Sequence, residues 1–285
     1  MRTITRNYPS PGIGPAALQL IYSGAWPGPP EDAWHAHTSR VVETFLRAHP
    51  PGSRDDWVMN IGCGGFHYGL AAPAMVCVDV VPRSLAMCCR RVVAAADLLP
   101  VEESSFDGVV CVGSVINYSN AVLVLREIRR ILRPGGVLVL EFERSESALY
   151  WGLAAYQKNY WPVTTQYKGS SHVIWVYSER YIREALARYG LEVQESRRFH
   201  SLSAAALRVT GSLRLAALVA WVDHALARSS LGAGASANVV LACKAVDTAH
   251  HTRTPLAVRP RRLRLFDRGL TSAREQRQRG MIPAR

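Results

Sequence analysis

Four segments between Trp57 and Glu143 decide the fold of this chain. They read WVMNIGCGG (57–65), MVCVDVVP (75–82), ADLLPVEESSFDGVVCVG (96–113) and RRILRPGGVLVLEFE (129–143). Each contains a short apolar run, which is typical of a strand buried on both faces of a parallel sheet. The first run ends at a Gly-Cys-Gly turn and the second ends in Asp79. Helical spacing before the last run completes an alternation that predicts an α/β fold with right-handed crossovers.

The flanking sequence extends this sheet and adds helices. We expect strands at 57–61, 76–79, 92–96, 107–112, 137–142, 191–199 and 237–245. We expect helices at 16–22, 31–48, 121–132, 178–190 and 204–228. The predicted organisation is an N-terminal helical arm (1–50), an α/β domain (51–246) with an aromatic insertion (about 146–178), and a basic, flexible tail (247–285).

Charge and cysteine usage narrow the function classes. The formal net charge is +12, but the tail from Asp247 onward holds ten arginines and three acids, so it carries most of the excess. The remaining chain is only mildly basic, which argues against a nucleic acid partner. The apolar segment 213–226 is interrupted by charges, and no membrane span is expected. The six cysteines lack metal-ligand spacing, so we expect free thiols in the cytoplasm and no metal.

The strand ends carry the candidate chemistry. A glycine turn after a strand lets a ligand approach the backbone, as Gly62 and Gly64 would allow. Asp79 could accept hydrogen bonds from ribose hydroxyls, or it could cap the following helix. Asp97, expected at the end of the third strand, could accept from the exocyclic amine of adenine. A typical NAD fingerprint has no such element.

The stretch from Val92 to Glu143 resembles the class I S-adenosylmethionine-dependent methyltransferases of the small-substrate type called methyltransferase type 11. The signature is A-D-x-x-x-P, then S-F-D, then E-I-x-R-x-L-R-P-G-G, and the resemblance is strong over residues 55 to 145. It implies a Rossmann-like seven-stranded sheet of order 3-2-1-4-5-7-6 with strand 7 antiparallel. It also implies S-adenosylmethionine as cofactor and S-adenosylhomocysteine as product. The aromatic insertion is expected to form a lid over the substrate pocket, and the alternative is a packing layer on the sheet.

The resemblance also assigns cofactor-binding residues. The methionine end would lie against Asn60 and the turn, the ribose against Asp79, the adenine beside Val80, Asp97 and Leu98, and the sulfonium near the end of strand four. The full set is Asn60, Gly62, Cys63, Gly64, Asp79, Val80, Asp97, Leu98, Gly113 and Ser114. Two departures stand out: Asn60 replaces the usual acid, and the segment before the second strand is short. The first helix should therefore be about one turn long or replaced by a loop.

Methyl transfer from a sulfonium needs a base only when the acceptor carries a proton at the working pH. The candidate bases are His35, His37, Tyr118, Glu141, Glu143, His172 and His200. His172 and Tyr118 are the first choices for mutation, and the sequence assigns the role to none of the seven.

The sequence thus predicts an enzyme that methylates an O or N atom of a small molecule, with secondary metabolism as its expected setting. One alternative is an RNA or protein methyltransferase that uses the Arg-rich tail as an anchor. A second is a non-catalytic, methyltransferase-like binding subunit, for which Asn60 and the altered turn are the support. The sequence specifies neither the acceptor nor the oligomeric state.

Overall fold

In a computed structural model of the protein, residues 14–23, 33–70, 74–167, 170–220, 222–223 and 235–246 are described. All of them lie within the first of two units into which the chain divides, residues 1–251. The predicted tail, 247–285, lies outside the described residues. Within the described segments, no helix combines the length and the apolar character that crossing a membrane requires.

The elements follow one another in the expected alternation. The strands are β1 (Val58–Ile61), β2 (Met75–Asp79), β3 (Arg91–Val93), β4 (Phe106–Cys111), β5 (Leu132–Glu143), β6 (Tyr160–Tyr167), β7 (Ser170–Tyr177), β8 (Leu191–Phe199) and β9 (Asn238–Ala245). The helices are α1 (Pro15–Ser23), α2 (Ala33–Ala48), α3 (Ala121–Ile131), α4 (Glu179–Arg188), α5 (Leu202–Thr210) and α6 (Leu213–Ala220). Three short 3-10 helices are η1 (Pro82–Leu85), η2 (Val115–Tyr118) and η3 (Ala148–Tyr150).

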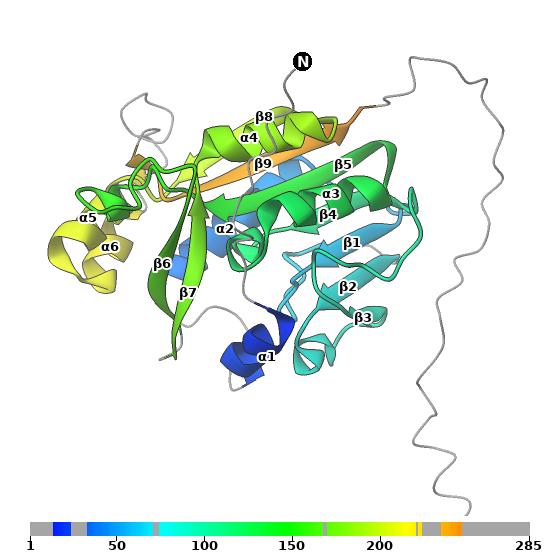
Figure 1. The fold of residues 1–285 in the computed structure, drawn as a ribbon, viewed down its shortest axis with the longest axis horizontal. Coiled ribbons are helices and arrows are strands. Elements are labelled where there is room, and N and C mark those ends of the chain that lie inside the picture. Colours follow the sequence, from blue (N-terminus) through cyan, green and yellow to red (C-terminus); the bar gives the residue numbers. More distant parts are fainter. Residues whose placement is uncertain are drawn as a thin grey trace, which may run out of the picture. The chain divides into compact units, whose positions relative to one another are not determined.

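Seven strands form one sheet in the order β3-β2-β1-β4-β5-β9-β8, shown in Figure 1. The first five are parallel, and β9 pairs antiparallel with both β5 and β8. Because β6 and β7 form a separate hairpin, β8 and β9 are the sixth and seventh strands of the sheet. The predicted strand order, with its antiparallel seventh strand, is therefore confirmed.

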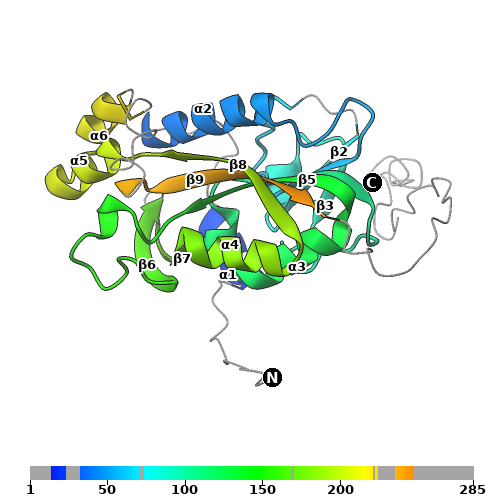
Figure 2. The same cartoon turned by 90° about the horizontal axis from the view of Figure 1, so that it is seen from above.

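Helices cover both faces of the sheet, with α2 on one side and α3 and α4 on the other (Figure 2). Successive side chains of a strand point to opposite faces. In β1, Val58 accordingly packs with the α2 residues Val42 and Phe45, while Met59 packs on the opposite side with Ile128 of α3. The alternation leaves the carboxyl ends of the parallel strands as the edge where loops converge.

Three local expectations are corrected by the structure. The third strand is shorter than predicted and ends at Val93, so Asp97 lies in a turn beyond the strand. The helix expected at 204–228 is interrupted, because Gly211 adopts a left-handed conformation that ends α5 before α6 begins. The aromatic insertion, for which no strands were predicted, forms the β6–β7 hairpin.

The crossover from β1 to β2 is a loop, as its short length in the sequence allows. Its described residues, 62–70 and 74, form turns and contain no helix. Gly69 adopts φ 68°, a left-handed turn conformation that glycine tolerates well. The shortened first helix expected from the sequence is a loop in this part of the structure.

Candidate functional site

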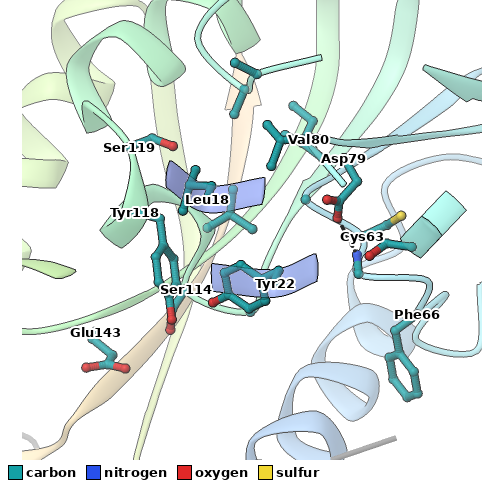
Figure 3. Close-up of a pocket in the computed structure, with 18 of the residues that line it drawn as sticks. Leu18, Tyr22, Cys63, Phe66, Asp79, Val80, Ser114, Tyr118, Ser119 and Glu143 are labelled. Atoms are coloured by element: carbon teal, nitrogen blue, oxygen red, sulfur yellow. Dashed lines mark hydrogen bonds between the residues drawn. The ribbon is translucent and has the colours of Figure 1, made fainter. Parts of the chain in front are cut away.

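A cavity of about 450 Å³ opens at the carboxyl ends of β1, β2 and β4. Figure 3 shows Cys63 and Asp79 on one side of it, and Tyr118 and Glu143 on the other. We call the first side the glycine-loop end (Gly62–Gly64, Asp79, Val80 and Ala94–Asp97). We call the second the aromatic end (Tyr22, Trp34, Tyr68, Tyr118 and Glu143). Both ends are built from described residues that line the cavity.

The glycine loop is fixed to the end of β2 by backbone hydrogen bonds. The N–H groups of Gly62 and Cys63 donate to the carbonyl of Val78 at 2.7 and 3.2 Å. Gly62 has φ +65°, and a Cβ atom at this position would lie 2.3 Å from Cγ2 of Val115. Both the backbone conformation and the close packing therefore require glycine at this position.

Asp79 holds the loop and also lines the cavity. Its Oδ2 accepts from the Gly64 N–H at 2.8 Å and its Oδ1 from the Val81 N–H at 2.9 Å. Burial raises the pKa of this carboxyl, and the backbone hydrogen bonds act in the opposite direction. A carboxylate has about four lone-pair sites, so two backbone donors leave capacity for two ribose hydroxyls. Asp79 therefore suits the predicted role and also fixes the loop beside it.

The segment that contains Asp97 is held from behind by α3. Oε1 of Glu127 accepts from the Leu99 N–H at 2.9 Å, and the Arg130 guanidinium donates to the carbonyls of Leu99 and Val101 at 3.0 and 2.8 Å. This clamp places Asp97 in the wall of the cavity, where its carboxylate could accept from an adenine amine. It explains why the motif places Glu and Arg about thirty residues after the acid.

Leu98 does not contribute to the cavity wall. Its side chain is 76% exposed, while the next residue, Leu99, is buried under the Glu127 clamp. Its predicted contact with adenine has no support in this geometry. Apolar contacts at this end come instead from Val80, Ala95 and Leu123.

Asn60 is fully buried behind the loop and does not line the cavity. Its Nδ2 donates to the carbonyl of Phe66 at 3.0 Å, which a carboxylate at this position could not do. Oδ1 has no hydrogen-bond partner among the described residues. The substitution of the usual acid is thus coupled to the altered loop, and contact of Asn60 with the cofactor stays a prediction.

Gly113 and Ser114 lie just after β4, where predicted, and both line the cavity. Their N–H groups donate to Oε2 of Glu141 at 2.8 and 2.7 Å, and Oε1 of Glu141 accepts from Asn238 at 2.6 Å. Burial raises the pKa of Glu141. This carboxyl is fully engaged in positioning the turn, so the candidate base Glu141 is a structural residue in this geometry.

Glu143, two residues further along β5, faces the cavity at the aromatic end (Figure 3). Its N–H donates to Oδ1 of Asn117 at 2.9 Å, and its carbonyl accepts from the same amide at 3.1 Å. Oε2 of its side chain accepts from the Tyr150 hydroxyl at 3.4 Å. Burial and the charge of Glu141 raise the pKa of Glu143 to about 7. A carboxyl with this pKa can take up or release a proton near neutral pH.

Tyr118 and His172, the two candidates singled out from the sequence, lie together. The Tyr118 hydroxyl is 3.3 Å from Nε2 of His172, and their rings stack with centroids 5.5 Å apart. Tyr118 lines the cavity, whereas His172 is buried behind it in the hairpin. His172 is thus placed to orient the phenol of Tyr118 rather than to contact a ligand directly.

The remaining histidine candidates differ in their position relative to the cavity. His35 lines the cavity, and His37 does not. His200 is fully buried, stacked on Trp34 with ring centroids 3.6 Å apart, and within 2.9 Å of the hydroxyls of Thr38 and Ser203. Burial lowers the pKa of His200 well below its ordinary value. It is a neutral bridge between α2 and α5.

The sequence predicts α1 and α2 as helices but does not show that they complete the cavity. Leu18 and Tyr22 of α1, and Trp34 and Thr38 of α2, line it together with Phe66, Tyr68 and Asn238. The position of α1 is fixed in part by Gln19, whose Nε2 donates to the carbonyl of Val80 at 2.8 Å. No described side chain of residues 146–178 lines the cavity, so the lid role of the insertion stays a prediction.

Comparisons with known proteins agree with this geometry. Residues 59–140 match a family model described as a methyltransferase domain. A search of curated protein sequences gave no significant match.

Solved structures of similar fold cover most of the chain. A protein described as an S-adenosylmethionine-dependent methyltransferase from Listeria monocytogenes has 10% identity and a TM-score of 0.53, covering 73% of this chain and 100% of its own. A geranyl diphosphate methyltransferase in complex with GPP and sinefungin has 18% identity and a TM-score of 0.50, covering 74% and 79%. The [4+2]-cyclase SpnF has 16% identity and a TM-score of 0.50, covering 81% and 92%.

At these identities the structures establish the fold alone, and the family model places the methyltransferase motifs upon it. The cavity contains the features those motifs imply: a glycine loop, an acid at the end of β2 and a second acid beyond β3. Residues 59–140 form a methyltransferase domain on the class I fold, and this match supports S-adenosylmethionine as the cofactor.

Proposed function

We propose that the enzyme methylates an oxygen or nitrogen atom of a small molecule. The observation that carries this proposal is the composition of the aromatic end. It combines Tyr22, Tyr118 and Trp34 with the carboxyl of Glu143, and no described lining residue of the cavity is Lys or Arg. Such a surface suits a planar or apolar acceptor better than a phosphate backbone, which would require cations.

In the proposed arrangement the glycine-loop end holds the cofactor. Asp79 would bind the ribose, Asp97 the adenine amine, and the turn at Gly113 and Ser114 would lie beside the reacting centre. The cofactor supplies a methyl group already activated by its sulfonium. The protein therefore has two tasks, to align the acceptor and to remove its proton.

Glu143 is the best-placed proton acceptor in this proposal. Its carboxyl faces the cavity beside Tyr118, and its pKa of about 7 leaves a large ionised fraction at neutral pH. The ionised carboxylate would accept the proton of a hydroxyl as the methyl group is transferred, or remove a proton from an ammonium group beforehand so that the nitrogen lone pair can attack. Tyr118, oriented by His172, would hydrogen-bond the acceptor or a water molecule beside it.

The cavity volume fits the proposal. About 450 Å³ lies within the roughly 300–1,000 Å³ typical of small-ligand pockets. The similar fold of geranyl diphosphate methyltransferase is consistent with a small acceptor, although it carries no residue assignment. The cysteines in the described residues are free thiols, which is consistent with a cytoplasmic location.

The test combines binding with an unbiased product assay. Calorimetry of the full chain should show S-adenosylmethionine and S-adenosylhomocysteine binding that Asp79→Ala and Asp97→Ala weaken. The enzyme is then incubated with isotopically labelled cofactor and separate pools of phenols, amines, bulk RNA and protein. Label should appear in a small molecule, and a variant lacking residues 250–285 should retain that activity.

Two results would overturn the proposal. Label transfer restricted to RNA or protein, and lost with residues 250–285, would favour a tail-anchored macromolecular methyltransferase. Binding of the cofactor without transfer to any pool, including a whole extract of small metabolites, would favour the non-catalytic alternative.

A further inference from the structure

Three cysteines far apart in the sequence form one buried cluster. Cys63 comes from the glycine loop, Cys77 from β2 and Cys88 from the segment after η1, and each is at most 6% exposed. Their sulfur atoms all lie within 4.8 Å of one another. Zinc–sulfur bonds of about 2.3 Å place the thiolates of a tetrahedral site about 3.8 Å apart, so a contraction of at most about 1 Å would bring these three into coordination distance.

An imidazole lies beside two of the three sulfur atoms, outside the group that lies within 4.8 Å. Nδ1 of His67 lies 3.7 Å from Sγ of Cys77, and its Nε2 lies 4.0 Å from Sγ of Cys88. His67 belongs to the same loop as Cys63 and is partly buried. Three thiolates and one imidazole, without an open position, are typical of structural zinc sites.

The surroundings suit a buried soft cation. The cluster is packed against Leu85 and Met75, which exclude water from the sulfur atoms. Figure 3 shows the sulfur of Cys63 on the side of the loop that faces away from Tyr118, so a metal there would not contact the acceptor. The loop joining β1 to β2 contains no helix in its described residues; backbone hydrogen bonds fix its start to β2, and turns form the rest.

We propose that this cluster is a structural zinc site, with the thiolates of Cys63, Cys77 and Cys88 as ligands and His67 as the fourth ligand after its ring moves to bring one nitrogen to the metal. Each thiol releases its proton to solvent when the metal binds. The ion ties the glycine loop to β2 and to the segment after η1, and so replaces the first helix as the support of the loop. The site contributes no ligand to the aromatic end, and it acts on methyl transfer only through the glycine loop that it supports.

Metal content is the direct test. The full chain is purified under reducing conditions, and its zinc content is measured by mass spectrometry of the elements. The metal-free protein is then titrated with Zn²⁺ and with Co²⁺. We expect one zinc per chain, and a cobalt derivative with thiolate-to-cobalt charge transfer and the intense visible bands of tetrahedral coordination.

Variants distinguish this site from adventitious binding. Cys77→Ser and Cys88→Ser should abolish stoichiometric zinc binding, whereas Cys89→Ser, an exposed neighbour of Cys88, should retain it. His67→Gln keeps all three thiols and should lower zinc affinity at least tenfold and alter the cobalt spectrum. Circular dichroism identifies any variant that fails to fold, and His67→Gln in the partly buried loop is the most conservative of the set.

Three results would overturn the proposal. The first is a reduced wild-type chain that takes up no zinc. The second is zinc uptake that survives in Cys77→Ser and Cys88→Ser. The third is a disulfide between two of the three cysteines in protein purified without reductant, combined with no zinc uptake after reduction. Because these measurements do not involve methyl transfer, they separate this proposal from the proposed function.

Discussion

The glycine-loop end and the aromatic end of the cavity are built in different ways. The first relies on backbone groups of adjacent parallel strands, with Gly62 and Gly64 bound to β2 and to Asp79. The second is assembled from side chains of α1, α2, η2 and β5, such as Tyr22, Trp34 and Glu143. The difference suggests that the cofactor side is constrained by the sheet itself, whereas the acceptor side can vary without disturbing it.

Glu143→Gln should have the largest effect and should act only at the aromatic end. Loss of a positioned base lowers the rate by about 100-fold to 10,000-fold, and S-adenosylhomocysteine affinity should stay unchanged. In the wild type, kcat/KM should rise with pH through about 7, because only the ionised carboxyl accepts a proton. The variant should lose this rise with pH, while Glu192→Gln, at an exposed position of β8, should keep it. If kcat/KM of Glu143→Gln still rises with pH as in the wild type, the base is another group.

The same pKa predicts a stability effect of defined sign. The folded chain favours protonated Glu143, because its pKa is raised from 4.5 to about 7. The favourable contribution is present below pH 4.5 and is lost as the pH rises through 7. Urea unfolding of wild type and Glu143→Gln across this range should show the wild type losing more stability on alkalinisation. If the free energy of unfolding changes with pH in the same way for both proteins, the pKa of Glu143 is not raised in the folded chain.

Asp79→Ala tests the opposite end. It removes a carboxylate that binds two loop N–H groups and, in our proposal, the ribose hydroxyls. Charged hydrogen bonds contribute about 1.5–3 kcal/mol each, so S-adenosylhomocysteine affinity should fall by at least about 10-fold to 100-fold in calorimetry. Asp79→Asn keeps the shape, and Asp55→Ala at an exposed position controls for charge. If S-adenosylhomocysteine affinity is unchanged in Asp79→Ala, the glycine-loop end does not bind the cofactor as proposed.

Gly62 and Gly64 offer a matched pair for the backbone argument. Gly62→Ala introduces a Cβ that overlaps Val115, and should cost about 1–3 kcal/mol in addition to about 1 kcal/mol for its left-handed conformation. Gly64 also has a positive φ, 56°, but a Cβ added there would have no atom within 4 Å. Gly64→Ala should therefore show only the cost of the left-handed conformation. Urea unfolding should rank them in this order, and Val115→Ala should partly rescue Gly62→Ala. Equal destabilisation would reject close packing as the cause.

Tyr118→Phe should have the smallest effect. It removes the hydroxyl that lies 3.3 Å from His172, and one neutral hydrogen bond contributes about 0.5–1.5 kcal/mol. The acceptor KM should rise by roughly 2-fold to 10-fold with the cofactor KM unchanged. His172→Phe should give a similar change if it acts by orienting Tyr118. A rise in the cofactor KM instead would show that the two ends are not independent.

The sequence predicts the glycine-loop end better because its determinants are local. Gly62 directly follows β1, Asp79 is the last residue of β2, and the Glu127–Arg130 clamp belongs to a recognisable motif. Glu141 and Glu143 look equivalent in the sequence, because both end β5. They differ because Asn238, 97 residues away, binds only the first. The position of α1 likewise depends on Gln19 reaching Val80 across 61 residues, which no local pattern encodes.

The position of β9 has a consequence for how this enzyme matures. The last strand of the sheet in sequence is inserted between β5 and β8, and it supplies Asn238 to the site. During synthesis, β5 and β8 emerge with unpaired edges that only β9 can join. Such long-range antiparallel closure is slow, and the incomplete sheet is prone to aggregate. Ribosomes that stop before residue 238 should therefore release chains that chaperones hold, and activity should appear only after synthesis passes residue 245.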